Sequence, residues 1–208
     1  MMYFIANLLH RRLLVLLGVV VGLIFLYTSV GAATEQKSEL TVVDDVDLER
    51  YFGTWYEIAH IPVWFQKGCI GGTTAEYTPL KEGFVNVVNR CCDKEGKVKE
   101  AKGRAWVVDK QHPAKLKVSF FSLFGLWLFG GKYWIIDLDE NYRYSVIGHP
   151  NREIGWILSR TPTLPDEVLQ GIAERLEAKG YDFSKFKMTN QTENNCTSPK
   201  QKNKMIDK

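Results

Sequence analysis

The chain has 208 residues, a formal net charge of +3 and 45% hydrophobic residues, enough for one domain with extensions at its ends. The basic excess is small and contains no block of like charges before the C-terminal tail. Proteins that bind nucleic acid need a clustered basic stripe, so the charge pattern excludes nucleic acid as a partner.

The N-terminus has the three parts of an export signal. His10–Arg12 precede an uninterrupted apolar run over residues 13–27, and small residues follow as far as Ala33. Extended through Ala33, the run reaches about the 20 residues that a membrane-spanning helix needs. Residues 1–33 are therefore either a signal peptide cleaved near Ala32 or Ala33, which we favour, or a retained membrane anchor. Both interpretations place the rest of the chain outside the cytoplasm, in the periplasm or associated with an envelope membrane.

Residues 34–43 are expected to form a linker, and short runs that alternate apolar and polar residues begin beyond it. Pro, Gly, Asn and Asp separate these runs, as turns require, at a spacing typical of β-sandwiches and β-barrels. Eight strands is also the number at which a closed barrel has room for one small ligand. The predicted strands cover residues 53–61, 71–79, 84–91, 99–109, 114–122, 132–138, 143–149 and 154–160.

Helical segments are expected on both sides of these strands, as a short turn at 47–50 and an amphipathic helix at 164–179. Pro165 lies near the start of the longer helix and Gly180 follows its end, as is common at helix termini. The apolar stripe of this helix predicts packing against the outside of a barrel. A short strand at 186–188 is expected to pair at an open seam.

Export predicts that the four cysteines form disulfides, because oxidising compartments favour pairing. Cys69 begins one predicted strand and Cys91 ends the next, and the turn between them is centred on residue 81. Cys91 and Cys92 both lie nearly opposite Cys69, within reach of a disulfide, and we predict the pair Cys69–Cys91. A link between Cys92 and Cys196 stays open. Since Cys69 is the first cysteine, no lipoprotein-type cysteine follows the apolar N-terminal segment.

Three stretches carry a specific family resemblance, and one of them, Lys115-Leu-Lys-Val-Ser-Phe-Phe121, lies in the middle of the chain. The first strand opens with Phe52-Gly-Thr-Trp-Tyr-Glu-Ile-Ala59, and the last closes with Trp156-Ile-Leu-Ser-Arg160-Thr-Pro162. Over residues 44–191 the chain resembles the lipocalin family, and it is most similar to the bacterial branch that includes apolipoprotein D-like and plant temperature-induced members. The resemblance implies an all-β fold, an eight-stranded antiparallel up-and-down barrel with one C-terminal α-helix packed outside.

The resemblance also implies that Gly53, Trp55 and Arg160 are structural residues. Arg160 would stack on Trp55 and close the barrel floor, in a cation–π contact worth about 0.5–2 kcal/mol. Strand alternation predicts that Ala59 and Ile61 face inward together with Trp55. Above this floor the family implies a cup for one small apolar molecule.

The ligand-binding residues are expected to be aromatic side chains on the inner wall and at the mouth of the cup. Trp156 shares its face with Arg160, which places it inside, whereas the faces of the others depend on strand register. Glu57 is also expected inside, where a buried carboxylate needs a partner. The predicted lining residues are Tyr77, Trp106, Phe120, Tyr133 and Trp156, and the predicted rim residues are Trp64, Trp127 and Phe129.

The connection over residues 120–131 is almost wholly apolar, although loops normally carry polar residues. It is the fifth connection, so it lies at the same end of a barrel as the first, residues 62–68, and both flank the mouth. An exposed apolar patch there indicates a membrane, a partner or a ligand rim. We favour rim or membrane contact through residues 123–130, and the alternative is a loop that folds inward and fills the cup.

These observations favour a non-catalytic protein that transports or stores a fatty acid, lysophospholipid or similar lipid in its barrel, for cell-envelope lipid maintenance. The sequence lacks the motifs of serine hydrolases, zinc proteases and phosphate-binding loops, and we expect no catalytic residue, no metal and no cofactor. A monomer or weak dimer is expected, with a disordered, Lys-rich tail at 192–208. Two alternatives stay open: a thiol-dependent isomerase-type enzyme in the same fold, and a membrane-docking interaction module with a filled barrel.

Overall fold

The computed structural model describes residues 38–191 and residue 196. Residues 39–191 and Cys196 belong to one compact unit, Glu39–Lys208. The predicted signal peptide or anchor at 1–33 lies outside the described residues, as does the predicted tail at 192–208 except for Cys196. No helix within residues 38–191 is long and apolar enough to cross a membrane.

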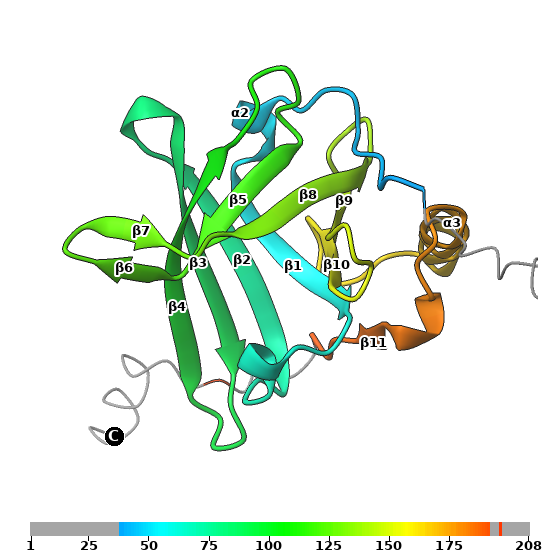
Figure 1. Cartoon of the computed structure of the whole chain (residues 1–208). Helices are drawn as coiled ribbons and strands as arrows, with labels where there is room; N and C mark the ends of the chain where they lie inside the picture. The colour runs from blue at the N-terminus through cyan, green and yellow to red at the C-terminus, as the bar shows by residue number, and fades with distance from the viewer. Residues whose placement is uncertain (1–37, 192–195, 197–208) are drawn as a thin grey trace, which may run out of the picture. The chain divides into compact units, whose positions relative to one another are not determined.

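Within the described residues, eight strands form an antiparallel ring in which β10 returns to pair with β1 (Figure 1). This closed barrel confirms the predicted fold class, and each predicted strand is present with ends that differ by a few residues. The ring consists of β1 (Gly53–His60), β2 (Gly71–Pro79), β3 (Phe84–Cys92), β4 (Val98–Val107), β5 (Lys115–Ser119), β8 (Gly131–Leu138), β9 (Tyr144–Gly148) and β10 (Gly155–Ser159).

The apolar connection between β5 and β8 forms a hairpin of its own. Its strands β6 (Phe121–Leu123) and β7 (Leu126–Leu128) pair only with each other. Figure 1 shows the hairpin projecting to the side of the barrel wall at β4. The loop therefore does not fill the cup, which was the alternative to rim contact.

Helices lie at the start and end of the ring. In α2 (Leu48–Tyr51), the Asp47 carboxylate accepts hydrogen bonds from the first backbone N–H groups and caps the helix. The longer helix, α3 (Asp166–Ala178), follows β10 and packs outside the barrel. The short 3-10 turns are η1 (Trp64–Gln66), η2 (Lys81–Gly83) and η3 (Phe183–Lys185).

Buried apolar residues form two clusters, one on each face of the barrel wall. The interior cluster surrounds Trp55, which has no exposed surface. The outer cluster packs Ile172 and Leu176 of α3 against Ile157 and its neighbours on the wall. Leu40, which falls in the predicted linker, is buried in this outer cluster, so the packed structure begins within that segment.

A bulge in β1 reverses the faces of the residues that follow it. The register with β10 shifts between Glu57 and Ala59, where Ile58 is the additional residue. Ala59 and Ile61 consequently pack in the outer cluster, and the prediction that both face inward is wrong. His60, which pairs with an inward-facing residue of β10, turns inward instead.

The C-terminal segment fills a gap between β1 and β2. The strand β1 pairs with β2 through Gly53–Tyr56, and beyond that point β11 (Lys187–Met188) takes the place of β2 beside β1. Gln191 then bonds to both sides, because its Nε2 donates to the carbonyl oxygens of Glu57 at 2.7 Å and Thr73 at 2.8 Å. The short C-terminal strand that the sequence predicts is therefore present, and it lies at a seam.

Arg160 closes the end of the barrel at which α2 lies. Its guanidinium carbon is 3.8 Å from the centroid of the Trp55 ring. The guanidinium also donates to the backbone carbonyl oxygens of Thr54, Arg50 and Tyr51, at 3.0, 2.7 and 3.2 Å. Three hydrogen bonds and a ring stack thus tie the last strand to the chain that enters the first.

Candidate ligand-binding site

The half of the interior nearest Arg160 and α2, called the closed half below, contains a chain of buried hydroxyl groups. The Tyr133 hydroxyl lies 2.9 Å from that of Tyr77 and 3.0 Å from that of Tyr51, which in turn lies 3.0 Å from Ser145 Oγ. Four hydroxyls share three hydrogen bonds, so one O–H hydrogen is not used within this group of hydroxyls. Burial raises the pKa of Tyr51 to about 12, and it also raises the pKa values of Tyr77 and Tyr133. All three side chains are therefore neutral phenols near neutral pH.

The cavity beside these hydroxyls is narrow. Its volume is about 10 Å³, which is room for about one water molecule. In this conformation the closed half is filled by its own side chains, so a larger ligand would have to lie nearer the mouth. The lining consists of Leu48, Tyr51, Phe52, Tyr77, Val85, Ala105, Leu116, Val118, Tyr133 and Ile135.

Aromatic rings line the open half of the interior. Phe120 follows β5, and its ring takes the space above Gly103, where an ideal Cβ would lie 2.8 Å from the ring. Trp156 lies on the inner face of β10 and packs against the interior cluster. The ring of Phe65 lies above it, with 6.4 Å between the centroids. Of the five predicted lining residues, Tyr77, Phe120, Tyr133 and Trp156 thus face the interior.

Trp106 does not face the interior, and this prediction is wrong. The inner face of β4 is made by Ala105 and Val107, which belong to the interior cluster, so Trp106 points outward. There it meets Gly130, whose ideal Cβ would lie 2.7 Å from the Trp106 ring. The smaller residues Ala105 and Val107 therefore face the barrel interior from β4. The larger Trp106 points outward and is covered by Gly130 at the end of the hairpin.

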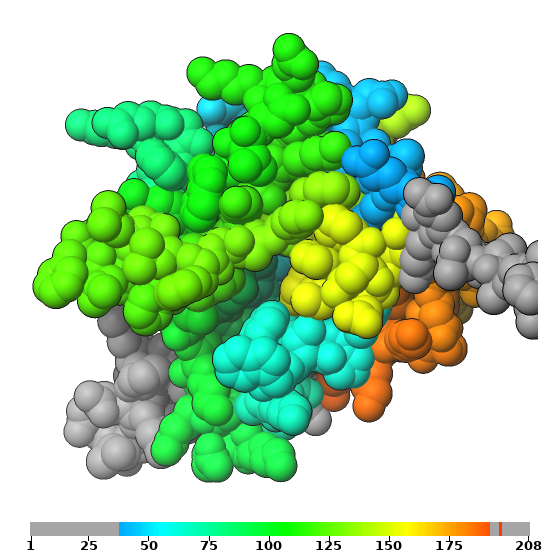
Figure 2. Space-filling view, viewed as in Figure 1, coloured from blue at the N-terminus to red at the C-terminus, as the bar shows by residue number. Residues whose placement is uncertain are grey.

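Trp127 also lies against the outer wall rather than at the rim. Its ring centroid is 5.3 Å from the guanidinium carbon of Arg104, a residue on the outer face of β4. The other two predicted rim residues are strongly exposed, Trp64 at 79% and Phe129 at 87%. Figure 2 shows the surface hollowed between the hairpin, the β1–β2 connection and the β9–β10 turn.

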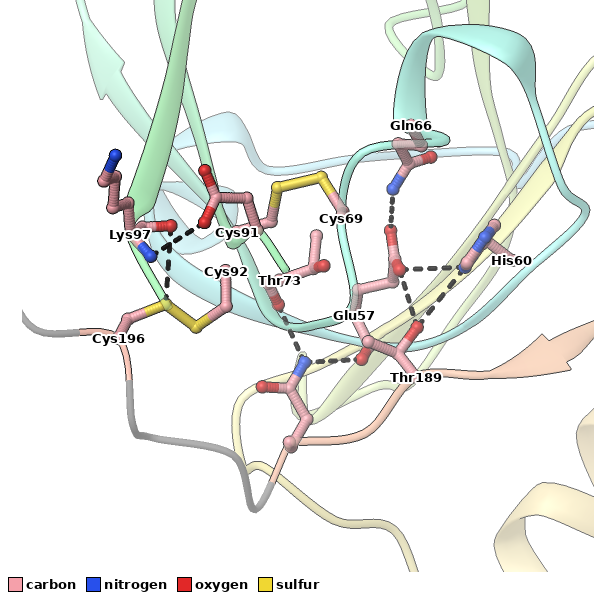
Figure 3. Close-up of a disulfide and its surroundings, with 12 residues drawn as sticks. Glu57, His60, Gln66, Cys69, Thr73, Cys91, Cys92, Lys97, Thr189 and Cys196 are labelled. Atoms are coloured by element: carbon pink, nitrogen blue, oxygen red, sulfur yellow. Dashed lines mark hydrogen bonds and ion pairs between the residues drawn. A yellow bond between two sulfur atoms is a disulfide. The ribbon is translucent and has the colours of Figure 1, made fainter. Parts of the chain in front are cut away.

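A polar cluster lies on the inner wall below η1, centred on the Glu57 carboxylate (Figure 3). Glu57 is 3% exposed. Its Oε1 accepts from Thr189 Oγ1 at 2.6 Å and lies 2.9 Å from His60 Nδ1. Its Oε2 accepts from Gln66 Nε2 at 2.7 Å. The buried carboxylate therefore has the partners that its burial demands.

Gln66 connects this cluster to the aromatic wall. While its Nε2 donates to Glu57, its Oε1 accepts from the Trp156 indole at 3.0 Å. The Gln66 amide thus anchors the η1 turn at the mouth of the barrel, because its nitrogen bonds to Glu57 and its oxygen bonds to Trp156. Gln66 is not among the predicted site residues, and its position in an aromatic loop was the one available signal.

Asn89 was also missed, and it adds a polar atom to the inner wall of the open half. It shares its face with Val87 of the interior cluster, and its cross-strand neighbours are the short residues Ala75 and Ala101. Its Oδ1 is buried and has no hydrogen-bond partner in the described part of the chain. A buried acceptor of this kind is where a bound hydroxyl or water would be expected.

All four cysteines of the sequence are paired. Cys69 is joined to Cys91, with 5.6 Å between their Cα atoms, and Cys92 to Cys196, with 5.5 Å. The second link, which the sequence left open, ties the end of the C-terminal segment to β3. Figure 3 shows both disulfides on the side of the barrel where the Glu57 cluster lies.

Comparisons with known proteins agree with this architecture. The family model for the lipocalin-like domain matches residues 46–191. Among curated proteins, the Escherichia coli outer membrane lipoprotein Blc is 39% identical over 163 residues, covering 78% of this chain and 88% of that protein. Mouse apolipoprotein D is 34% identical over 192 residues, covering 84% and 96%.

A plant protein and a solved insect structure extend the comparison. Temperature-induced lipocalin-1 of Arabidopsis thaliana is 37% identical, covering 76% of this chain and 86% of that protein. Insecticyanin from the tobacco hornworm superposes with a TM-score of 0.62 over 77% of this chain and 89% of its own, at 22% identity. At that identity the insecticyanin match supports the fold alone.

Proposed function

Because the chain belongs to the lipocalin family, we propose that it is a non-catalytic carrier that binds one lipid in the open half of its barrel. The ligand would be a fatty acid, a lysophospholipid or a similar single-chain lipid, and the role would be storage or transfer of lipid in the cell envelope. The observation that supports it most is the inner wall of aromatic and small residues beneath an aromatic mouth. Such surfaces gain free energy when they bury a hydrocarbon chain.

The positions of polar groups favour a lipid with a hydrogen-bond donor near its head. The acyl chain would lie against Phe120 and Trp156, because the closed half is filled by the tyrosines. Asn89 Oδ1 offers a buried acceptor beside the two alanines. A glycerol or amide group on the ligand would satisfy that acceptor, whose burial otherwise costs about 1–3 kcal/mol.

Fluorescence titration of the delipidated protein with a monoacylglycerol tests the carrier role. We expect saturable quenching that is carried mainly by Trp156, since this indole lines the open half. Trp156→Phe should lose most of the signal, whereas the matched change Trp134→Phe on the outer face should retain it. Absence of quenching by every long-chain lipid tried would contradict the proposal.

Asn89→Ala should weaken monoacylglycerol binding more than binding of a fatty-acid methyl ester.

The enzymatic alternative would need a free thiol. At least one of the two disulfides, Cys69–Cys91 or Cys92–Cys196, would have to be reduced before one of its cysteines could act as a nucleophile. Titration of thiols on the mature protein decides between the two readings, because the carrier role predicts none and the enzyme predicts at least one.

The exposed hairpin supports a second role, contact with a membrane surface. Phe124 is 96% exposed, Phe129 87% and Leu126 66%, a concentration of bare apolar side chains that is uncommon on soluble surfaces. We include this contact in the proposed function, because a carrier must meet the membrane from which it takes lipid. Phe124→Ser with Leu126→Ser should reduce co-flotation with liposomes while leaving quenching by lipid unchanged.

A further inference from the structure

Lysines form an unusual row on the outer face of the wall next to the hairpin. Trp106, Lys117 and Lys132 lie directly opposite one another on β4, β5 and β8. Lys115 lies opposite Trp134 on the same face. Like charges in directly opposite positions repel, so the pair Lys117 and Lys132 destabilises the sheet unless something neutralises it.

The described residues do not supply that neutralisation. Neither Lys117 nor Lys132 has a carboxylate within ion-pair distance in the described ranges 38–191 and 196; Lys132 instead lies 5.5 Å from the Trp134 ring. Lys115 has a carboxylate 3.8 Å away, but that residue, Glu39, is largely exposed and the pair is weak. The row therefore keeps an excess of positive charge that faces outward.

Arg104 adds a further cation to the same face. Its guanidinium carbon lies close to two aromatic rings, 5.0 Å from the centroid of Phe84 and 5.3 Å from that of Trp127. Its Nε is buried and has no hydrogen-bond partner within the described part of the chain. Like the two lysines, Arg104 has aromatic neighbours but no carboxylate at ion-pair distance among the residues that the structure describes.

The apolar hairpin and the cationic row are parts of one surface. Gly130, which leaves the hairpin, passes over the row so closely that an ideal Cβ would lie 2.7 Å from the Trp106 ring and 3.4 Å from Lys117 Cβ. The exposed side chains of Phe124, Leu126 and Phe129 extend from this base. The surface thus has an apolar tip followed by a belt of tryptophan and lysine.

Bare apolar side chains next to tryptophans and uncompensated cations match the layers of a bilayer that carries negative charge. Apolar groups suit the acyl region, tryptophan suits the boundary, and lysine is attracted to the anionic phosphate surface. We propose that this face is a docking site for anionic phospholipid bilayers, in which the hairpin enters the acyl region and Lys117, Lys132 and Arg104 bind the headgroup phosphates. The proposal rests on the membrane contact put forward above, and it adds the class of lipid that the surface selects.

Flotation of the unit Glu39–Lys208 tests the selection without interference from the apolar N-terminal segment. This unit contains the closed ring, both apolar clusters and both disulfides, which are the elements of an independently folding domain. We expect it to float with vesicles that contain phosphatidylglycerol, and much less with vesicles of phosphatidylcholine alone. Each lysine should contribute roughly fivefold to partitioning at low salt, and added salt should reduce the difference.

The decisive variant is Lys117→Gln with Lys132→Gln, compared with Lys185→Gln plus Lys187→Gln, which removes the same charge from η3 and β11. The first should lose on the order of tenfold or more of its binding to anionic vesicles, with an unchanged circular dichroism spectrum and unchanged lipid quenching. Equal binding of both double variants would overturn the site, as would equal flotation of the unchanged unit on neutral and anionic vesicles. A unit that floats on neither vesicle would instead remove the membrane contact itself, with the carrier role judged separately by quenching.

Discussion

Arg160 shows how one side chain can define an end of the barrel. It stacks on Trp55 and donates to the carbonyl oxygens of Arg50 and Tyr51, which precede β1, and of Thr54, which lies within β1. Gly53 makes room for it: its φ is +99°, and an ideal Cβ there would lie 3.3 Å from Arg160 Nη1. The spacing of Gly53, Trp55 and Arg160 in the sequence is thus explained by the contacts that these three residues make with one another.

Replacing Arg160 with Met should lower the free energy of unfolding by about 2–4 kcal/mol, since it removes three charge-assisted hydrogen bonds and the ring stack. Met keeps most of the side-chain volume, so the loss reports the guanidinium rather than a cavity. Urea unfolding measures the effect, with the exposed turn residue Lys110→Met as the control, for which a change near zero is expected. A loss below about 0.5 kcal/mol for Arg160→Met would show that water replaces these bonds at little cost.

At the scale of elements, the C-terminal segment acts as a ninth strand that repairs the ring where β1 and β2 separate. Its backbone bonds reach both strands, since Thr189 N donates to Ile58 O at 2.9 Å and Gly72 N donates to Asn190 O at 2.8 Å. The Thr189 side chain also reaches through the seam to Glu57. Thr189 therefore links the Glu57 polar cluster to the C-terminal segment that closes the gap between β1 and β2.

Gln191→Ala should weaken this seal locally. The amide that donates to both strands is lost, and two buried carbonyl oxygens lose their donor, a penalty of about 1–3 kcal/mol. Hydrogen exchange should become faster at the Gly72 and Thr189 amides, and far less so in β8 and β9. Gln170→Ala on the exposed face of α3 should leave these amides unchanged. A uniform increase across the whole barrel would indicate global destabilisation instead.

At the scale of the whole molecule, the buried tyrosines link stability to alkaline pH. Their pKa values lie above the ordinary 10, with Tyr51 at about 12, so the folded state favours the neutral phenols. Stability should be intact below pH 10 and should decrease as the pH rises toward 12 and beyond. Each tyrosine would contribute a slope of about 1.4 kcal/mol per pH unit in that window.

Urea unfolding at increasing pH, followed together with tyrosinate absorbance, checks this expectation. Tyr133→Phe removes the central hydroxyl, so the decrease with pH should be shallower than in the unchanged protein. Tyr56→Phe, on the outside of β1, is the matched control and should keep the original slope. Tyrosinate that appears at pH 10 without unfolding would contradict the burial on which the prediction depends.

The sequence predicted the barrel well because local rules govern it. Alternation and turn residues located the eight strands, and the turn between β2 and β3 was short enough to place Cys69 opposite Cys91. The faces were harder, since each depends on contacts that are distant in sequence. The bulge at Ile58 turned Ala59 outward, and Trp106 points outward because its neighbours on β4, Ala105 and Val107, face the interior.

The polar residues of the site were the least predictable. Gln66 and Asn89 are ordinary surface residue types, and only the closed barrel places one above Glu57 and the other between two alanines. The hairpin, by contrast, has a local sequence signal, because Phe121–Leu128 contains two short apolar runs on either side of Phe124-Gly125. In the structure both of these turn residues have a positive φ. That pattern is typical of a tight two-residue turn.

The direct pairing of β5 with β8 makes the intervening hairpin an accessory to the sheet rather than a link in it. Its length and composition can therefore change without breaking the closed ring of hydrogen-bonded strands, so the proposed membrane contact can be altered separately from the barrel interior. The β6–β7 hairpin is therefore a practical site for grafting. Replacing it with a short turn from another protein would give a closed barrel without the exposed apolar side chains.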